Sequence, residues 1–320
     1  MKKLFQTGML AAALYIAAAA HAQKDALAQA NAALQDGEAD KALSLLNSLP
    51  ASAETHNLKC RVLYTLQRWD GAVNECEQAV KTDEQNSDYH LWLGRALGEK
   101  ADRASFLSAY SLGKRVREEF EAAVNANARN AEALADLGEF YYSAPGVVGG
   151  GSGKATNIAA RLDKVDGARA LELRGRIAEQ GKDYATAERE FKQAISVSEH
   201  PAFQWMALAS FYRRRERWDD MESAVQNGVK AAQRDKRSGV ALYNGASTLI
   251  KTERNHALAA KMLEDYLAGP VKTEEAPAFE AHTRLARVKA QMGDVAGARQ
   301  ERSAALQLAH DYKPAQELKF

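Results

Sequence analysis

The hydrophobic positions of this chain follow a helical period over nearly its whole length. Apolar side chains recur at i, i+3, i+4 and i+7, and alanine is far more frequent than the β-branched residues. Short polar turns, such as those at Arg68 and Lys182, interrupt the pattern. The pattern therefore predicts an all-α fold made of short helices joined by tight turns.

Small residues recur at matching places along these helices. Cys60 lies twelve residues before Ala72, and Gly175 lies twelve residues before Ala187, with a turn between the two positions in each case. Small side chains at such positions let two antiparallel helices approach closely. The spacing predicts a repeating helix-turn-helix unit with a period near 34 residues.

This unit resembles the tetratricopeptide repeat (TPR) family, and the resemblance extends over residues 23–320. It implies a right-handed α-solenoid of about eight TPR-like helix-turn-helix repeats, with a concave groove lined mainly by the first helix of each repeat. Stacked repeats would form one continuous domain. The expected copies are 23–52, 53–86, one that starts at Ser87, one that starts at Ala131, 168–201, 202–235, 238–275 and 279–313.

Two central copies are longer than the family pattern. Residues 100–113 delay the second helix of the third copy, and their apolar content predicts longer helices rather than a loop. Residues 143–153, rich in glycine, interrupt the fourth copy before a helix that we expect to begin at Lys154.

The first 22 residues have the pattern of a secretory signal peptide. Two lysines precede an apolar run that ends in the small-x-small motif Ala20-His21-Ala22. The alternative is an uncleaved membrane anchor, but the run is short for a bilayer span. We expect cleavage after Ala22 and a periplasmic or secreted protein comprising residues 23–320, without stable insertion in a membrane.

Charge and motif content exclude several classes of function. Lys and Arg total 43 and Asp and Glu total 42, so the formal net charge of +1 provides no surplus of cations for nucleic acid. The histidines do not have metal-ligand spacing, and no Gly-x-Ser-x-Gly nucleophile motif is present. We therefore expect no enzymatic activity, no metal and no cofactor.

The concave groove is the predicted binding surface. Arginines and carboxylates alternate with aromatic residues at its inward-facing positions, which include Asn57; such a surface suits an extended peptide or protein segment. The alternative is an ordinary solvated surface with internal ion pairs. The candidate binding residues are Arg61, Tyr64, Trp92, Arg95, Glu139, Tyr142, Glu172, Arg176 and Arg213.

The glycine-rich stretch fails the spacing of a phosphate loop. Val148 stands where that motif needs its first glycine, and Ala155 stands where it needs Ser or Thr. The start of the following helix is still a candidate anion site, because free N–H groups at a helix N-terminus attract anions; the alternative is a purely structural loop. The candidate residues for this anion site are Gly151, Ser152, Gly153 and Lys154.

Cys60 and Cys76 are the only cysteines, and they fall on the two helices of one copy. In an antiparallel hairpin they lie roughly opposite each other, and export would permit their oxidation. The sequence leaves two interpretations open, a disulfide or two buried reduced thiols.

Together these features predict a non-enzymatic exported binding scaffold that holds a peptide or protein partner in its concave TPR groove. The alternative is a small-ligand or transport-accessory protein that uses the loop over residues 141–154 as a pocket wall.

Overall fold

The computed structural model describes residues 21–320, so most of the predicted signal peptide lies outside the described residues. Within this range every regular element is a helix, and consecutive helices form eight pairs, which confirms the predicted all-α array. The first helices of the pairs are residues 21–35, α3 (Ala53–Thr65), α5 (Ser87–Ala101), α7 (Ala131–Ser143), α9 (Gly167–Gln180), α11 (Pro201–Arg214), α13 (Gly239–Lys251) and α15 (Ala278–Gln291).

The second helices are α2 (Ala39–Asn47), α4 (Trp69–Thr82), α6 (Phe106–Ala126), α8 (Ser152–Leu162), α10 (Tyr184–Val197), α12 (Trp218–Ala232), α14 (His256–Ala268) and α16 (Val295–Leu308). Two short 3-10 helices, η1 (Gly146–Val148) and η2 (Lys236–Ser238), and a final turn of helix, α17 (Lys313–Gln316), complete the described chain.

One type of turn joins the two helices in most pairs. In the turn between α9 and α10, Lys182 adopts a left-handed φ of 63°. Its N–H bonds to the Glu179 carbonyl, and the N–H of Asp183 bonds to the Ala178 carbonyl. These two bonds form a Schellman motif, which satisfies carbonyls at the end of a helix. The same left-handed residue recurs at Gly37, Gln67, Glu216, Glu253 and Gly293.

The recurring small residues let the two helices of a pair touch. A Cβ added at Gly175 would lie 3.1 Å from the Phe191 ring, and one added at Gly94 would lie 2.5 Å from the Phe120 ring. Each glycine on a first helix thus makes room for an aromatic ring from the second helix. These contacts explain the spacing of small residues along the sequence, because a larger side chain would push the two helices apart.

The longer third and fourth copies differ in how they use their additional residues. In the third copy α6 extends to 21 residues, which confirms that residues 100–113 lengthen helices. In the fourth copy the insertion forms η1, and α8 begins at Ser152. The prediction that this helix begins at Lys154 was therefore wrong by two residues, because Gly151 serves as the N-cap and its carbonyl accepts the N–H groups of Lys154 and Ala155.

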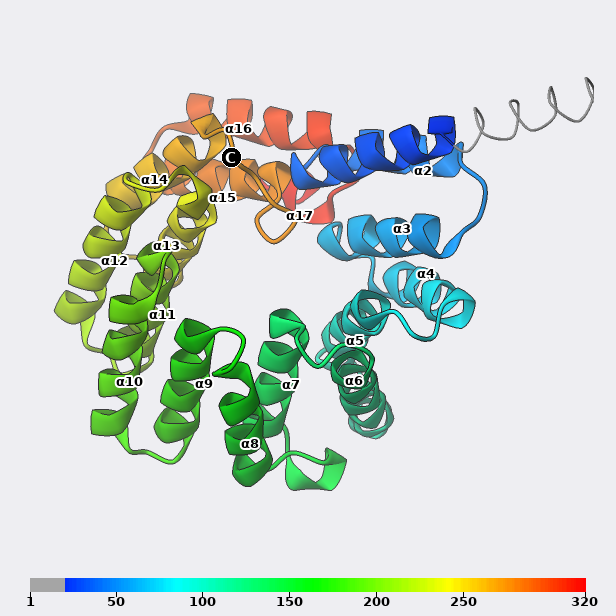
Figure 1. Ribbon diagram of the computed structural model, residues 1–320. Helices are drawn as coiled ribbons and strands as arrows, with labels where there is room; N and C mark the ends of the chain where they lie inside the picture. Colours follow the sequence, from blue (N-terminus) through cyan, green and yellow to red (C-terminus); the bar gives the residue numbers. More distant parts are fainter. Residues whose placement is uncertain (1–20) are drawn as a thin grey trace, which may run out of the picture.

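The array closes on itself, which the sequence pattern does not predict. In Figure 1 the helices follow one another around a central opening until the red C-terminal helices lie beside the blue N-terminal ones. One apolar cluster joins the two ends: Leu34 and Leu46 from the first repeat are in the same buried core as Phe279 and Tyr312 from the last. Because each end covers the apolar face of the other, the array does not need a separate polar cap.

Polar contacts also join residues that are far apart in the sequence. Gln67 donates a hydrogen bond to the Tyr312 hydroxyl at 3.1 Å, and Asp40 accepts hydrogen bonds from the N–H and the ring of His310. Gly37 has a φ of 75°, and a Cβ added there would clash with the backbone of Ala278. A glycine is thus needed where the first repeat meets α15.

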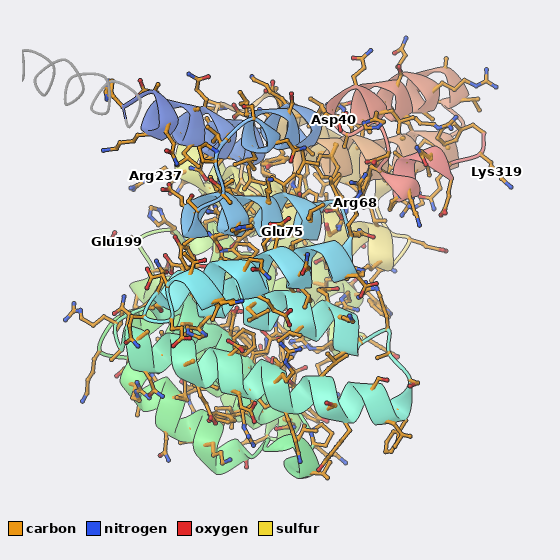
Figure 2. All side chains as sticks on the ribbon, turned by 90° about the vertical axis from the view of Figure 1, so that its right-hand side faces the viewer. Asp40, Arg68, Glu75, Glu199, Arg237 and Lys319 are labelled. Carbon is orange, nitrogen blue, oxygen red and sulfur yellow. A yellow bond between two sulfur atoms is a disulfide. The ribbon has the colours of Figure 1, made fainter. Side chains whose placement is uncertain are left out.

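The two edges of the ring carry different turns. In Figure 2, Arg68 in the turn within the second repeat lies toward one edge, and Glu199 and Arg237 between repeats lie toward the other. In the described part of the chain, no helix combines the length and the apolar character needed to cross a membrane.

Candidate functional site

Ring closure turns the predicted groove into a lumen. A cavity of about 880 Å³ lies inside the ring, and the N-terminal turns of α3, α5, α7 and α9 contribute to its wall. The segment between α14 and α15 completes the wall with Glu274 and Glu275; Figure 1 shows this orange loop reaching into the central opening. The site is therefore built from both halves of the sequence.

Trp92 and two arginines form the centre of the lumen wall. The Arg61 and Arg95 guanidinium carbons lie 5.4 Å and 4.8 Å from the centroid of the buried Trp92 ring. The Tyr64 ring meets Trp92 edge-on, with centroids 5.5 Å apart. The predicted residues Arg61, Tyr64, Trp92 and Arg95 therefore form one contiguous cluster, in which cation–π contacts fix the two guanidinium groups.

The charges of both arginines are already paired within the chain. Arg61 binds Glu274 through two bonds, Nε to Oε2 at 2.8 Å and Nη2 to Oε1 at 2.5 Å. Arg95 bonds to Asp136 at 2.6 Å and to Glu132 at 3.0 Å. An acidic side chain of the protein itself thus occupies the guanidinium fork that the sequence suggested for a partner's carboxylate.

Carboxylates outnumber cations around the lumen. Several of them, such as Glu54 and Asp88, lie in the first turn of a helix, where they complement the helix dipole. Glu275 has no such role, because it lies in the loop before α15. The charged wall residues are Lys24, Arg61, Arg95, Arg169, Glu54, Asp88, Glu132, Asp166, Glu274 and Glu275.

Glu275 has an electrostatically unfavourable position. Burial raises the pKa of its carboxyl, and the charge of Glu132 raises that pKa further, while Arg95 lowers it. The side chain is nevertheless accessible from the lumen. It makes no ion pair with any residue that the structure describes. A positive group that entered the lumen would therefore stabilise its ionised form.

Asn57 presents an unsatisfied acceptor in the same wall. The residue is only 5% exposed, it lines the lumen, and its side-chain oxygen has no hydrogen-bond partner in residues 21–320. The side-chain oxygens of Asn86 and Asn130 in this wall differ, because they cap α5 and α7. Leaving a buried acceptor unpaired costs about 1–3 kcal/mol, so a ligand N–H that reached this oxygen would gain a hydrogen bond.

Two further hollows contain other groove candidates. Arg95 lines both the lumen and a second hollow of about 370 Å³, which Tyr64 and Glu139 also line. Tyr142 lines a third of about 500 Å³, where burial raises the pKa of its hydroxyl to about 12.

Three candidates are absent from these hollows, as far as residues 21–320 show. Arg176 lies 4.0 Å from Glu172 on the same helix, and burial raises the pKa of Glu172. Arg213 makes no ion pair with a described residue, and it belongs to α11 on a different part of the ring. Their role as binding residues stays a prediction.

The glycine-rich loop is held by its own bonds. The Lys154 amine donates to the Gly149 carbonyl at 3.0 Å and lies 5.3 Å from the centre of the Tyr141 ring. The Gly151 N–H bonds to the Tyr141 carbonyl, and a Cβ at Gly150 would clash with the Ala144 carbonyl. The loop therefore needs glycine for close packing. Gly151, Ser152 and Gly153 line or adjoin the third hollow, and their role as an anion site stays a prediction.

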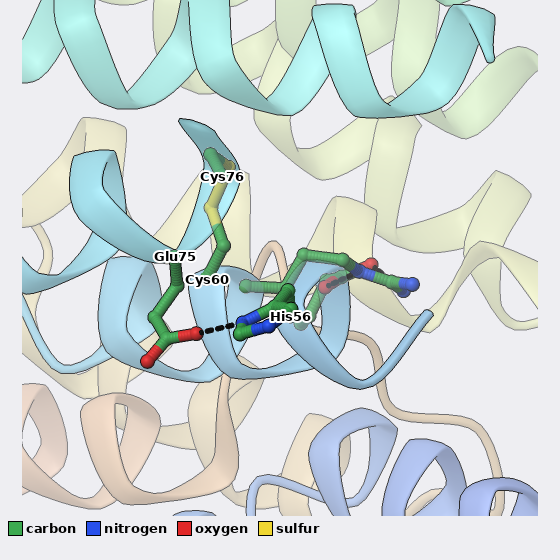
Figure 3. Close-up of a disulfide and its surroundings, with 6 residues drawn as sticks. His56, Cys60, Glu75 and Cys76 are labelled. Atoms are coloured by element: carbon green, nitrogen blue, oxygen red, sulfur yellow. Dashed lines mark hydrogen bonds and ion pairs between the residues drawn. A yellow bond between two sulfur atoms is a disulfide. The ribbon is translucent and has the colours of Figure 1, made fainter. Parts of the chain in front are cut away.

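A disulfide joins Cys60 and Cys76, whose Cα atoms are 5.2 Å apart (Figure 3). Both residues are fully buried. They are sixteen residues apart, as are Gly175 and Phe191 in the fifth repeat, so the bond replaces a glycine–aromatic contact between two helices.

A His–Glu pair, which sequence reasoning missed, joins the first and second helices of three repeats. His56 lies 2.6 Å from Glu75 beside the disulfide (Figure 3). His90 pairs with Glu119 at the same distance, and this hydrogen bond raises the pKa of His90. A third pair joins His282 and Glu301. The sequence does contain a signal for these pairs. His56 and Glu75 are nineteen residues apart, as are His282 and Glu301. The spacing of His90 and Glu119 is ten residues longer because the third copy contains ten additional residues.

Only one group of side chains in residues 21–320 has the composition and spacing of a cation site. Asp40, His310 and Asp311 place one ligand atom each within 4.8 Å of the others, where the ends of the array meet. Asp40 already bonds to His310, and Asp311 pairs with Arg68. These contacts join the two ends of the array, so the three side chains have a structural role without a bound cation.

No protein-family model matches the chain, and no curated protein matches it. Its fold is similar to several solved structures. TTC0263, a thermophilic TPR protein of Thermus thermophilus, is 21% identical with a TM-score of 0.46, and the match covers 62% of this chain and 100% of that one. YrrB, described as a TPR protein with an unusual peptide-binding site, is 15% identical with a TM-score of 0.37, covering 62% and 97%.

PilF of Pseudomonas aeruginosa is 13% identical with a TM-score of 0.40, and the match covers 83% of this chain and 95% of that one. The assignment of this chain rests on its own helical pairs and on the small residues that recur between them. By that arrangement the chain is an all-α helical-repeat protein, and its helical pairs resemble TPR units.

Proposed function

We propose that the ring is a binding scaffold that holds an extended segment of a partner protein in its lumen. The observation that carries this proposal is the buried, unpaired side-chain oxygen of Asn57 in the lumen wall. A main-chain N–H of an extended segment is a suitable donor for this oxygen, because such a segment has N–H groups that no secondary structure satisfies.

The charge of the wall favours a basic segment. Arg61 and Arg95 are already paired with carboxylates of the protein, so they offer little to an acidic ligand. Glu275 faces the lumen without an ion-pair partner in the described chain, and Glu132 is close enough to raise its pKa. A lysine or arginine of the partner would relieve the repulsion between these two carboxylates, so we propose it as the second recognition element.

We further propose that the protein acts outside the cytoplasm. Residues 1–22 have the signal-peptide pattern, and the buried disulfide suits an oxidising compartment. N-terminal sequencing of the protein recovered from an exporting host tests this point. We expect the sequence to start at Gln23, and a retained Met1 in the recovered protein would contradict export with cleavage.

A displayed library of random twelve-residue peptides tests the binding proposal. We expect the wild-type ring to enrich peptides that contain Lys or Arg. Selected peptides should bind Asn57→Leu about three- to tenfold more weakly, because one hydrogen bond of about 1 kcal/mol is lost while the branched shape of the side chain is kept. Glu275→Gln should remove the preference for basic peptides.

Gln204→Leu is the matched control for the amide substitution. Gln204 is also buried with an unpaired side-chain oxygen, but it lies on α11 and outside the lumen wall. It should leave peptide affinity unchanged. Failure to enrich any peptide, or equal affinity of wild type and Asn57→Leu, would contradict the proposal; thermal melting establishes that each variant is folded.

A further inference from the structure

The N-terminal end of α6 exposes large apolar side chains. Phe106 is 86% exposed and Leu107 is 80% exposed, more than any other large hydrophobic residue between residues 21 and 320. They are the first two residues of α6, in the part of this helix that the ten-residue insertion adds. No neighbouring helix of the ring covers them, so these two side chains contribute little buried area to the fold.

The side chains along this end of α6 change character in a fixed order. Phe106 and Leu107 come first, Tyr110 follows one turn later, and Lys114 and Arg115 follow one turn after that. The Lys114 amine lies 4.4 Å from the centre of the Tyr110 ring. Apolar, aromatic and basic groups succeed one another in the same order from the acyl chains of a bilayer to its headgroups, where tyrosine and lysine are favoured.

The local charge fits an anionic surface. From Arg103 to Arg117 the chain has four cations and no carboxylate, although its total charge is close to zero. Arg103 and Arg115 pair with Glu99 and Glu77, and Arg117 pairs with Glu118 and Glu121 on its own helix. Lys114 has no carboxylate partner in the described chain, so its charge is available to an anionic surface. A free cation next to exposed apolar side chains combines the two attractions that hold peripheral proteins on anionic bilayers, burial of apolar groups and contact with charged headgroups.

The position of this end also permits contact with a flat surface. It follows the turn between α5 and α6, which is a turn within a repeat and so shares the edge of the ring that carries Arg68 (Figure 2). Because the wall of the lumen is built from the opposite ends of the first helices, docking by this edge would leave the lumen accessible.

We propose that the N-terminal end of α6 docks the ring onto bilayers that contain anionic lipids, with Phe106 and Leu107 entering the interface. The attachment is peripheral, and it does not depend on what occupies the lumen.

Sedimentation of the full chain with vesicles tests this inference. One set of vesicles contains phosphatidylcholine alone, and the other contains phosphatidylcholine and phosphatidylglycerol at three to one. We expect binding to the anionic vesicles that weakens as salt rises. Phe106→Ser combined with Leu107→Ser should lower the partition coefficient at least about tenfold, because two apolar side chains are lost from the interface. Lys114→Gln should lower it about fivefold.

Val197→Ser is the matched control, because Val197 is 52% exposed at the end of α10. It should bind vesicles like the wild type, and all variants should melt at the wild-type temperature because none of these side chains is buried. The inference is overturned if the wild type does not sediment with anionic vesicles or if the double variant sediments equally well. It is also overturned if the exposed residues instead mediate a dimer, seen in sedimentation velocity, that shows no affinity for vesicles.

Discussion

The disulfide of the second repeat gives the most quantitative prediction. The bond joins Cys60 and Cys76, sixteen residues apart, in the positions that Gly175 and Phe191 occupy in the fifth repeat. In the chain-entropy account, closing a loop of this length stabilises the folded state by about 3 kcal/mol. With a urea dependence near 3 kcal/mol per molar, loss of the bond should lower the unfolding midpoint by about 1 M.

Equilibrium urea unfolding, followed by far-ultraviolet circular dichroism with and without a phosphine reductant, measures this difference. Both cysteines are fully buried, so reduction requires opening of the repeat and the samples must reach equilibrium in denaturant. Cys60→Ala with Cys76→Ala should unfold at the same urea concentration with and without reductant. Cys60→Gly with Cys76→Phe should be more stable than the alanine pair, because it recreates the glycine–aromatic contact.

Two results would contradict a stabilising disulfide. Two free thiols in the denatured, unreduced protein would show that the bond does not form. A wild-type midpoint that does not change with reductant would show that closing this loop contributes nothing to stability.

Three further predictions concern turns and charges. Lys182→Gly should raise the free energy of unfolding by about 0.5–1 kcal/mol in urea titrations, because glycine adopts the left-handed turn conformation without strain; a decrease would contradict the role of the turn. The raised pKa of His90 means that its bond to Glu119 stabilises the fold below about pH 6.5, and the effect is lost as pH rises through the raised value. The stability difference between wild type and His90→Gln should therefore shrink between pH 6 and pH 9, and a constant difference would argue against a charged pair. Burial would raise the pKa of Glu188, but hydrogen bonds from Arg217 and others lower it to about 2. Its stabilisation, about 1–3 kcal/mol, should be complete above about pH 4.5 and disappear as pH falls to 2, as a comparison with Glu188→Gln at several pH values would show.

The repeat architecture could be predicted from the sequence because its causes are local. Gly175 and Phe191 touch within one helical pair, so the small residue and its spacing recur wherever a pair recurs. The apolar residues of the insertion after Lys100 likewise predict a longer helix, since the helical period continues through them. The start of α8 was misplaced because Gly151, Ser152 and Gly153 all fit an N-cap position by residue type, and only the hydrogen bonds to the Gly151 carbonyl identify the cap.

Closure and the chemistry of the lumen could not be predicted in this way. Arg61 contacts Glu274, which is 213 residues away in the sequence, and Asp40 contacts His310, which is 270 residues away. Such contacts arise from the summed curvature of all the repeats, which no short window of sequence contains. The phase of the first helices did place Arg61 and Trp92 on the inner surface, but it gave no sign that an acidic loop from the last repeats would fill the fork of Arg61.

Closure of the array into a ring is the claim on which the lumen depends. Cross-linking of Asp40→Cys with His310→Cys by a short bismaleimide tests it directly, because these side chains touch in the structure and the native cysteines are already bonded. We expect an intramolecular cross-link in the folded monomer that is lost in urea and reduced by Gly37→Ala, which crowds the junction with Ala278. A folded monomer that forms no such cross-link would show that the ends stay apart, and the lumen would then be an open groove.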